Sequence, residues 1–251
     1  MNVKITVKFL LFIVLLMSAG GSFTAHAKAA EKKSSTSSKN KIVICIDAGH
    51  QSKANNAKEP IAPGSKTVKS KVSSGTQGVS TGKPEYKLNL EVALKLEQAL
   101  QKDYKVVMVR RTNNVNISNS KRAVICNEAG ADLAIRLHAD GSEKRSTQGM
   151  SFLYPSSSNP STKIIAQPSL EAAKVLSQTV LNETRAASRG IVPRSDLTGF
   201  NWSTVPVVLI EMGFMTNPNE DRKMSQAAYQ DKIVLGIKKG LDSYYKDISK
   251  K

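Results

Sequence analysis

The chain has 251 residues, of which 37 are Lys or Arg and 20 are Asp or Glu, so its formal net charge is +17. This length suits one domain with a substantial core, and the presence of only two cysteines excludes a small scaffold held together by disulfides. The excess of positive charge favours polyanionic partners through long-range attraction, although lysine also serves simply to keep a protein surface soluble.

Residues 1–27 are predicted to be a secretory signal. Two lysines precede an apolar run at 9–17, which is shorter than the roughly 20 residues of a membrane-spanning helix, and small residues suited to cleavage follow. An uncleaved anchor is the alternative. Residues 28–40 are rich in Lys and Ser without apolar periodicity, so we expect a flexible linker and a folded domain over 41–251. A secreted basic protein would meet anionic wall polymers or a lipid surface rather than nucleic acid.

Strands and helices alternate in the first half of the folded part. The continuous apolar run at 42–47 is typical of a strand covered on both faces. Residues 52–83 show no apolar period and are predicted to be a long loop, either functional or mobile. Pro84 then begins a helix with apolar residues at 88, 92, 96 and 99, spaced by three or four positions on one face. A second strand is expected at 105–110.

The alternation continues to the C-terminus. A helix capped by Ser118 or Asn119 is expected to end at Gly130. The remaining predicted elements are strands at 132–138 and 205–211, an exposed strand at 149–154, a helix opened by Pro168, and a last helix at about 226–247. The pattern indicates a single α/β domain with a mostly parallel twisted sheet of about six strands and helices on both faces.

The two cysteines fall inside predicted elements. Cys45 lies in the first strand and Cys126 in a helix. Because free cysteine packs as a small hydrophobic residue, we expect two buried thiols. A bridge between them is the alternative, which sequence alone does not decide.

Chemically active side chains follow three of the predicted strands. Parallel strands bring their C-terminal ends to one edge of a sheet, where ligands bind, and His50, His138 and Glu211 stand at such ends. Neutral imidazole is a preferred zinc ligand, and catalytic zinc commonly has two histidines and a glutamate. Glu85, in the first turn of its helix, is the carboxylate expected beside them. Its alternative role is a first-turn acid favoured by the helix dipole.

Glu211 ends a strand that has no other polar residue. Burying an ionised carboxylate there is unfavourable unless it is paired or near a metal. Partial desolvation raises the pKa of a glutamate, which suits a residue that transfers protons. A salt bridge to a Lys or Arg is the structural alternative.

Four motifs together resemble one enzyme family. In chain order they are Asp47-Ala48-Gly49-His50 after a strand; Glu85 and Asn89 at the start of a helix; Arg122, Asn127, Ala131-Asp132 and His138-Ala139-Asp140; and the run PVVLIEMGFMTNPNED at 206–221. The last motif is the most specific. Over about 42–247 the chain resembles the zinc-dependent N-acetylmuramoyl-L-alanine amidases of the amidase-3 type.

The chain departs from the pattern of that family at a few positions. Ala48 replaces a proline, Gln51-Ser52 replace two glycines, Arg136 stands where a serine is common, and Asp140 replaces an asparagine. None of these changes removes an expected zinc ligand or the expected catalytic carboxylate.

The resemblance implies a function for each expected site residue. It implies that His50, Glu85 and His138 bind zinc and that Glu211 is the catalytic acid and base. The implied reaction is hydrolysis, by zinc-activated water, of the amide between N-acetylmuramic acid and L-alanine of the peptidoglycan stem peptide. We therefore expect a bacterial, secreted protein at the cell wall or the outer face of the membrane. Its expected partners are peptidoglycan and anionic wall polymers, with no nucleic acid; we expect a monomer and leave a regulatory protein partner open.

Two other functions stay open. The chain could be a non-catalytic wall-binding or regulatory module on the same scaffold, or a zinc peptidase that acts on stem peptides. In the implied amidase, arginines would bind carboxylates of the stem peptide through bidentate hydrogen bonds. The candidates are Arg111, Arg122, Arg189 and Arg194, of which Arg122 is more suited to a structural role within its helix. Asp47 would either support the histidine ligands or cap a turn.

Overall fold

A computed structural model describes residues 41–248. The expected signal peptide at 1–27 and the expected linker at 28–40 lie outside the described residues. Within 41–248, no helix combines the length and the apolar character that crossing a membrane requires.

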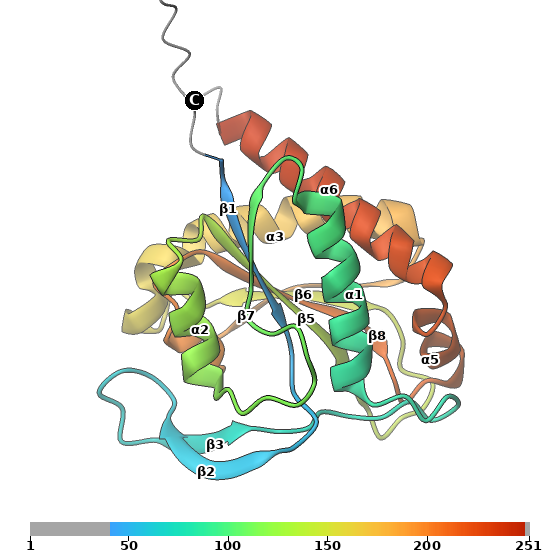
Figure 1. Ribbon diagram of the computed structural model, residues 1–251, viewed down its shortest axis with the longest axis horizontal. Helices are drawn as coiled ribbons and strands as arrows, with labels where there is room; N and C mark the ends of the chain where they lie inside the picture. The colour runs from blue at the N-terminus through green and yellow to red at the C-terminus, as the bar shows by residue number, and fades with distance from the viewer. Residues whose placement is uncertain (1–40, 249–251) are drawn as a thin grey trace, which may run out of the picture. The chain divides into compact units, whose positions relative to one another are not determined.

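Six strands form the central sheet, in the spatial order β4-β1-β5-β8-β6-β7 (Figure 1). Their bounds are β1 (Val43–Ala48), β4 (Lys105–Met108), β5 (Leu133–Asp140), β6 (Met150–Pro155), β7 (Ser188–Arg194) and β8 (Val207–Phe214). Strands β4, β1, β5 and β8 run parallel. Strand β6 is antiparallel to β8 and parallel to β7. The predicted mostly parallel α/β sheet is confirmed.

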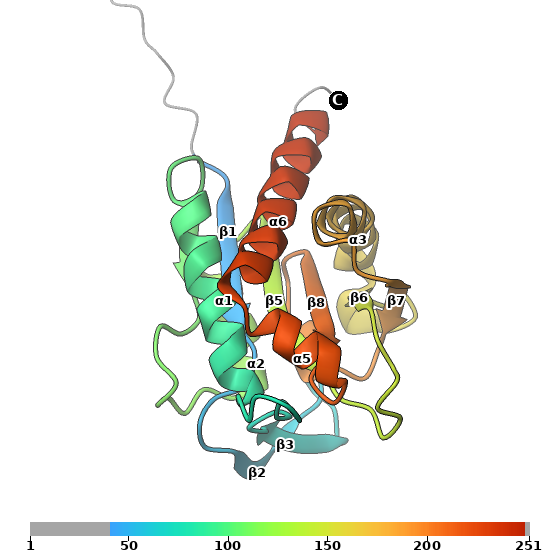
Figure 2. The same cartoon turned by 90° about the vertical axis from the view of Figure 1, so that its right-hand side faces the viewer.

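Helices cover both faces of this sheet, as predicted. They are α1 (Glu85–Leu100), α2 (Asn119–Glu128), α3 (Lys163–Thr184), α4 (Thr198–Asn201), α5 (Pro218–Met224) and α6 (Ala227–Ile248). Helices α1, α3 and α6 lie together on one face (Figure 2) and bury its larger apolar cluster, which includes Ile46, Ile135 and Ile210. On the other face α2 and α4 pack around a smaller cluster with Cys45 and Phe200.

Two predictions for the second half of the chain were wrong: the start of one helix and the exposure of one strand. Helix α3 begins at Lys163, so Pro168 lies inside it instead of opening it. Proline leaves the carbonyl four residues earlier without its N–H partner; that residue, Ile164, is 90% exposed, so water can reach this turn. Strand β6, expected to be exposed, is mostly buried because β7 pairs with its outer side. The edge position of β7 explains why it tolerates Pro193.

The segment 52–83 is not the structureless loop that its composition predicted. It contains a hairpin of two antiparallel strands, β2 (Asn55–Pro60) and β3 (Val68–Val72), which form a separate small sheet. Glu59 attaches β2 to the start of α2, because its buried carboxylate accepts hydrogen bonds from the backbone N–H and the hydroxyl of Ser120. The hairpin therefore has a defined position beside the C-terminal end of β1.

The expectation of two free thiols was also wrong. Cys45 and Cys126 form a disulfide, with their Cα atoms 5.5 Å apart. The two residues are 81 positions apart in the sequence, and only the packing of α2 on β1 brings them within bonding range. The bridge ties the strand that leads to His50 to the helix that carries Arg122.

Candidate metal centre

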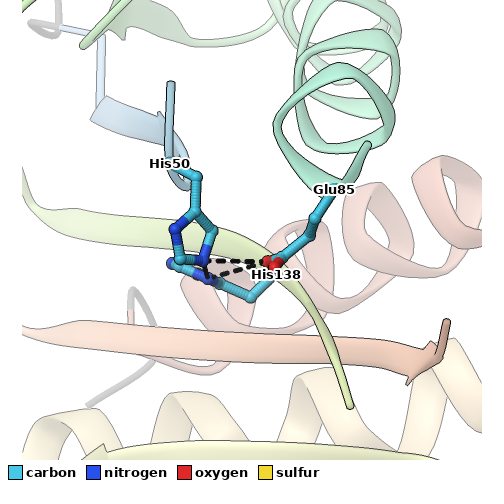
Figure 3. A group of neighbouring side chains, drawn as sticks. All are labelled: His50, Glu85 and His138. Carbon is cyan, nitrogen blue, oxygen red and sulfur yellow. Dashed lines mark hydrogen bonds and ion pairs between the residues drawn. The ribbon is translucent and has the colours of Figure 1, made fainter. Parts of the chain in front are cut away.

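His50, Glu85 and His138 converge at the C-terminal edge of the parallel strands (Figure 3). His50 stands two residues after β1, Glu85 is the first residue of α1, and His138 lies on β5. The backbone of His50 adopts the left-handed conformation, with φ of 61°, which is uncommon for a residue other than glycine. The guanidinium of Arg122 holds this turn by donating to the carbonyl of His50 at 2.8 Å.

One atom from each side chain forms a nearly equilateral triangle. Glu85 Oε1 lies 3.1 Å from His50 Nε2 and 3.2 Å from His138 Nδ1, and the two nitrogens are 3.2 Å apart. Two imidazole nitrogens and one carboxylate oxygen are typical zinc ligands, at about 2.0–2.2 Å from the ion. A point at about this distance from all three atoms exists, so the donor set fits a single zinc ion.

The surroundings of the two histidines suit metal binding. The Nδ1 atom of His50 lies 3.0 Å from the carbonyl oxygen of Ser73. Because a carbonyl only accepts, Nδ1 carries the proton and the lone pair of Nε2 faces the centre. Burial lowers the pKa of His138 to about 4, against the opposing effect of Glu85. Its ring is therefore uncharged at neutral pH, as a metal ligand must be.

Glu85 is held as a buried anion. Its Oε1 accepts from the side-chain amide of Asn89 and from the backbone N–H of Ala139, both at 3.1 Å, and its Oε2 accepts from the N–H of Thr76 at 2.9 Å. Burial raises the pKa of this carboxyl group, but the neighbouring imidazoles of His138 and His50 outweigh it and hold the pKa well below the usual range. The predicted ligand thus has the charge that a cation requires.

Two glycines keep the space for this triad. A Cβ atom on Gly49 would lie 2.3 Å from Cε1 of His138, and one on Gly75 would lie 2.5 Å from Oε2 of Glu85. Gly75 also has φ of +83°. With Ser73 and Thr76, it belongs to the segment 52–83, whose contribution to the site the sequence analysis missed. The cluster of glycines in that segment was the one available signal.

Glu211 lies on β8 directly beside His138, its register partner on β5. Its Oε2 is buried and has no hydrogen-bond partner in the described part of the chain. Burial, together with the charges of Glu85 and Asp140, raises the pKa of Glu211 well above 4.5, against the effect of two arginines. The alternative of a salt bridge is not realised within 41–248, where no cation lies within ion-pair distance of this carboxylate.

Glu211 stands between two cavities. One, of about 440 Å³, is lined also by Asp140 and Arg189. The other, of about 290 Å³, is lined also by His50 and His138. A substrate lying across Glu211 would therefore pass directly over the histidine pair and extend to both sides.

Asp47 supports the metal centre indirectly, through hydrogen bonds with two arginines. Its carboxylate accepts from Nη1 of Arg122 at 2.7 Å and from Nε of Arg136 at 3.0 Å. Burial raises the pKa of Asp47, but Arg122 and Arg136 outweigh it and hold the pKa well below the usual range. Arg122 in turn donates to the carbonyls of Ala48 and His50, so Asp47 positions the turn that presents His50.

The structure separates the four arginines that were candidates for binding substrate carboxylates. Arg122 is buried and structural, as its helix position suggested. Arg111 and Arg194 are paired with carboxylates at the surface. Arg189 has no ion pair among residues 41–248; its guanidinium lies 5.1 Å from the ring centre of Phe214 and borders the larger cavity. It is the arginine best placed to meet an anionic group in that cavity.

Comparisons with known proteins identify the family of this chain. A family model described as N-acetylmuramoyl-L-alanine amidase matches residues 44–243. The N-acetylmuramoyl-L-alanine amidase Rv3717 of Mycobacterium tuberculosis is 27% identical over 212 residues, which cover 81% of this chain and 86% of that protein.

Two solved structures show the same fold. The amidase Ami1 of Mycobacterium abscessus superposes with a TM-score of 0.74 at 26% identity, covering 82% of this chain and 99% of that one. An N-acetylmuramoyl-L-alanine amidase of Clostridium difficile 630 gives a TM-score of 0.68 at 28% identity, covering 82% and 98%. Because the family match spans most of the described domain and the predicted motifs meet at one edge of its sheet, this chain belongs to the amidase-3 family of N-acetylmuramoyl-L-alanine amidases.

Proposed function

We propose that the protein is a zinc-dependent hydrolase that cleaves the amide between the lactyl group of N-acetylmuramic acid and L-alanine of the stem peptide. One observation carries this proposal: three ligand atoms lie within 3.2 Å of one another, and two of their residues, His50 and His138, line a cavity that Glu211 also lines. The family match supports the choice of substrate bond.

His50, Glu85 and His138 would hold the metal. Two histidines and a glutamate are a ligand set of catalytic zinc sites. A zinc ion bound there would supply Lewis acidity and bring the pKa of a water ligand toward about 7. The contacts that orient the ligands, from Ser73 to His50 and from Asn89 to Glu85, are of the kind that tunes metal affinity.

Glu211 would transfer the proton. Its carboxylate takes a proton from the attacking water as the oxygen of that water bonds to the carbonyl carbon. The carbon–nitrogen bond then breaks, and the same proton passes to the departing alanine nitrogen. The acyl carbon keeps the water oxygen with its second hydrogen, and the resulting carboxylic acid gives that proton to the released amine, so the products are a carboxylate and an ammonium group. A raised pKa favours this double role, because the group must first accept and then donate near neutral pH.

We propose that the protein acts outside the cytoplasm, on peptidoglycan. The net charge of +17 would favour anionic wall polymers by long-range attraction. In the larger cavity, Arg189 would face carboxylates of the stem peptide. A regulatory protein partner, a monomeric state and cleavage of the signal remain expectations.

Product analysis on purified peptidoglycan tests this function. The zinc-loaded protein should release stem peptides with a free alanine N-terminus and leave unsubstituted lactyl carboxylates on the glycan, both visible by mass spectrometry. Glu211→Gln is the matched control, because it keeps the size of the side chain and should release nothing measurable over the same time.

The two other functions predict different products. A zinc peptidase would shorten the peptides while leaving alanine attached to the lactyl group. A non-catalytic module would bind the wall in a sedimentation assay and release no peptide. Either result with the fully zinc-loaded protein would refute the amidase assignment.

A further inference from the structure

Arg136 places a buried guanidinium at the centre, and the proposed chemistry does not yet use it. It lies on β5 two residues before His138, so both side chains point to the same face of the sheet. Arg136 is only 6% exposed. It lines the cavity of about 290 Å³ together with both histidines and Glu211. A positive charge therefore borders the space where the scissile amide would lie.

Most of the donors on this guanidinium have no partner. An arginine carries five N–H groups. For Arg136 only Nε has a hydrogen-bond acceptor in the described chain, Oδ2 of Asp47 at 3.0 Å. Its two Nη atoms lack an acceptor within 41–248, yet neither is sealed from solvent like the oxygen Oε2 of Glu211. Their N–H groups are consequently available to an acceptor in the cavity that Arg136 lines.

The neighbouring Arg122, by contrast, has hydrogen-bond acceptors for all of its guanidinium nitrogens. All three of its nitrogens are bonded: Nε to the carbonyl of Ile117, Nη1 to Asp47 and Ala48, and Nη2 to His50 and Gln51. Both arginines share the single carboxylate of Asp47. One negative charge against two positive charges leaves an excess, and Arg136 is the member of the pair that borders the cavity with free donors.

The backbone of α4 makes room for this side chain. A Cβ atom on Gly199 would lie 1.5 Å from Nη1 of Arg136, so any larger residue would displace the guanidinium. Arg194 also lines the cavity, but Asp196 neutralises it through two hydrogen bonds of 2.7 and 2.9 Å.

We propose that Arg136 is a further catalytic residue, whose Nη groups bind the lactyl oxygen that is a carbonyl in the substrate, an oxyanion in the intermediate and part of a carboxylate in the product. This inference rests on the proposed function. When water adds to the carbonyl carbon, the π electrons of the C=O bond move to this oxygen. They return when the carbon–nitrogen bond breaks and the nitrogen leaves with its proton. The guanidinium stays protonated throughout and contributes hydrogen bonds and charge.

The test compares Arg136→Met with the parent protein and with Arg136→Lys. Asp47 keeps Arg122 as a partner in each variant, so the fold should persist. Loss of a donor to an oxyanion lowers kcat by about 10²–10³. We therefore expect Arg136→Met to lose about this much in kcat on a soluble muramyl peptide, with KM changed by less than about threefold and zinc content unchanged. Arg136→Lys, which restores the charge, should recover at least about tenfold of the loss. Arg111→Met, which removes a surface arginine, is the matched control and should keep full activity.

Product binding supplies a second readout that a purely structural role would not move. N-acetylmuramic acid carries the lactyl carboxylate, whereas N-acetylglucosamine lacks it. In the parent protein, N-acetylmuramic acid should bind more tightly than N-acetylglucosamine. Titration of the zinc-loaded proteins should show that the ratio of the two Kd values falls at least about tenfold in Arg136→Met. An unchanged kcat, or a preference for the carboxylate sugar that does not depend on residue 136, would overturn the proposal. A protein that cleaves no wall but shows this Arg136-dependent preference would refute the proposed function and keep the anion site.

Discussion

Glu85 and Glu211 lie at the same edge of the sheet, yet their surroundings favour opposite protonation states. Glu85 accepts hydrogen bonds from Asn89, Ala139 and Thr76 and contacts both histidines. Glu211 has a buried oxygen without a partner in the described residues. The pKa of Glu85 is held below the usual range, and that of Glu211 is raised.

The number of hydrogen-bond donors around each carboxylate, and not its burial, separates the pKa values of Glu85 and Glu211. Burial raises the pKa of both carboxyl groups. Only Glu85 has enough donors and imidazole neighbours to reverse that effect. A metal ligand must be anionic, whereas a group that accepts and returns a proton works best with a pKa near the working pH. Pairs of carboxyl groups whose environments separate their pKa values are a general sign of such a division of labour.

The largest effect on metal binding and activity is expected when Glu85, the carboxylate that accepts several hydrogen bonds, is changed. Glu85→Gln keeps the size of the side chain but removes the charge that a metal cation requires. Metal affinity should fall by more than about 100-fold, beyond the effect of removing an outer hydrogen-bond partner, and wall hydrolysis should disappear with it. Elemental analysis after dialysis measures the zinc. A stoichiometric zinc content in this variant would show that the ligand assignment is wrong.

The matching change at Glu211 should separate zinc binding from the catalytic rate. Glu211→Gln should keep one zinc per chain, because no ligand is altered. Its kcat should fall by about 10²–10⁴, the range of a lost general acid or base. Release of alanine N-termini from soluble muramyl peptide measures the rate. Parental activity would exclude Glu211 as the proton-transferring group.

Asn89→Ala would make Glu85 resemble Glu211 in part. The change removes one donor to Oε1 of Glu85, together with the bond from Asn89 to the carbonyl of Gly49. Zinc affinity should fall by about 10–100-fold, as for other supporting residues of metal sites, and competition with a chromogenic chelator measures it. Asn182→Ala, at an exposed position on α3, should leave the affinity unchanged.

The smallest effect concerns stability, and its sign should differ between the two carboxyl groups. The folded pKa of Glu211 lies above its usual 4.5, so ionisation destabilises the fold as pH rises from about 4.5 through the raised value. Glu211→Gln should therefore raise the melting temperature of the metal-free protein at pH 8 more than at pH 4. The change should amount to a few degrees, since 1 kcal/mol corresponds to about 2–4 °C at this chain length.

Glu85 should behave in the opposite way. Its folded pKa lies below 4.5, so its contribution to stability is present above that pH and is lost as the pH falls through the lowered value. Glu85→Gln should lower the melting temperature at pH 8 and have less effect at pH 4. Thermal melts in chelator at the two pH values measure both variants, and shifts of the same sign would contradict the comparison.

Much of the site followed from local sequence patterns. The apolar runs before His50, His138 and Glu211 predicted three parallel strands, and parallel strands end at one edge. Pro84 marked the start of the helix that presents Glu85. These signals are local, because the hydrophobic periodicity of a strand and the capping residues of a helix lie within a few positions of one another.

Other features depended on contacts between distant parts of the chain. Ser73 and Thr76 contact the site only because the segment 52–83 folds back over it, and its polar residues carry no periodicity that would reveal this. The Cys45–Cys126 bridge and the shared carboxylate of Asp47 likewise join elements far apart in sequence.

Sequence alone therefore determined which elements form and which side chains reach the edge of the sheet, since these follow from periodicity and strand direction. The tertiary structure decided which hydrogen bonds each carboxylate and each guanidinium receives. Those bonds keep Glu85 anionic, their absence leaves the pKa of Glu211 raised by burial, and they leave Arg136 with unpaired donors. Desolvation and donor geometry of this kind arise only when separate segments pack together.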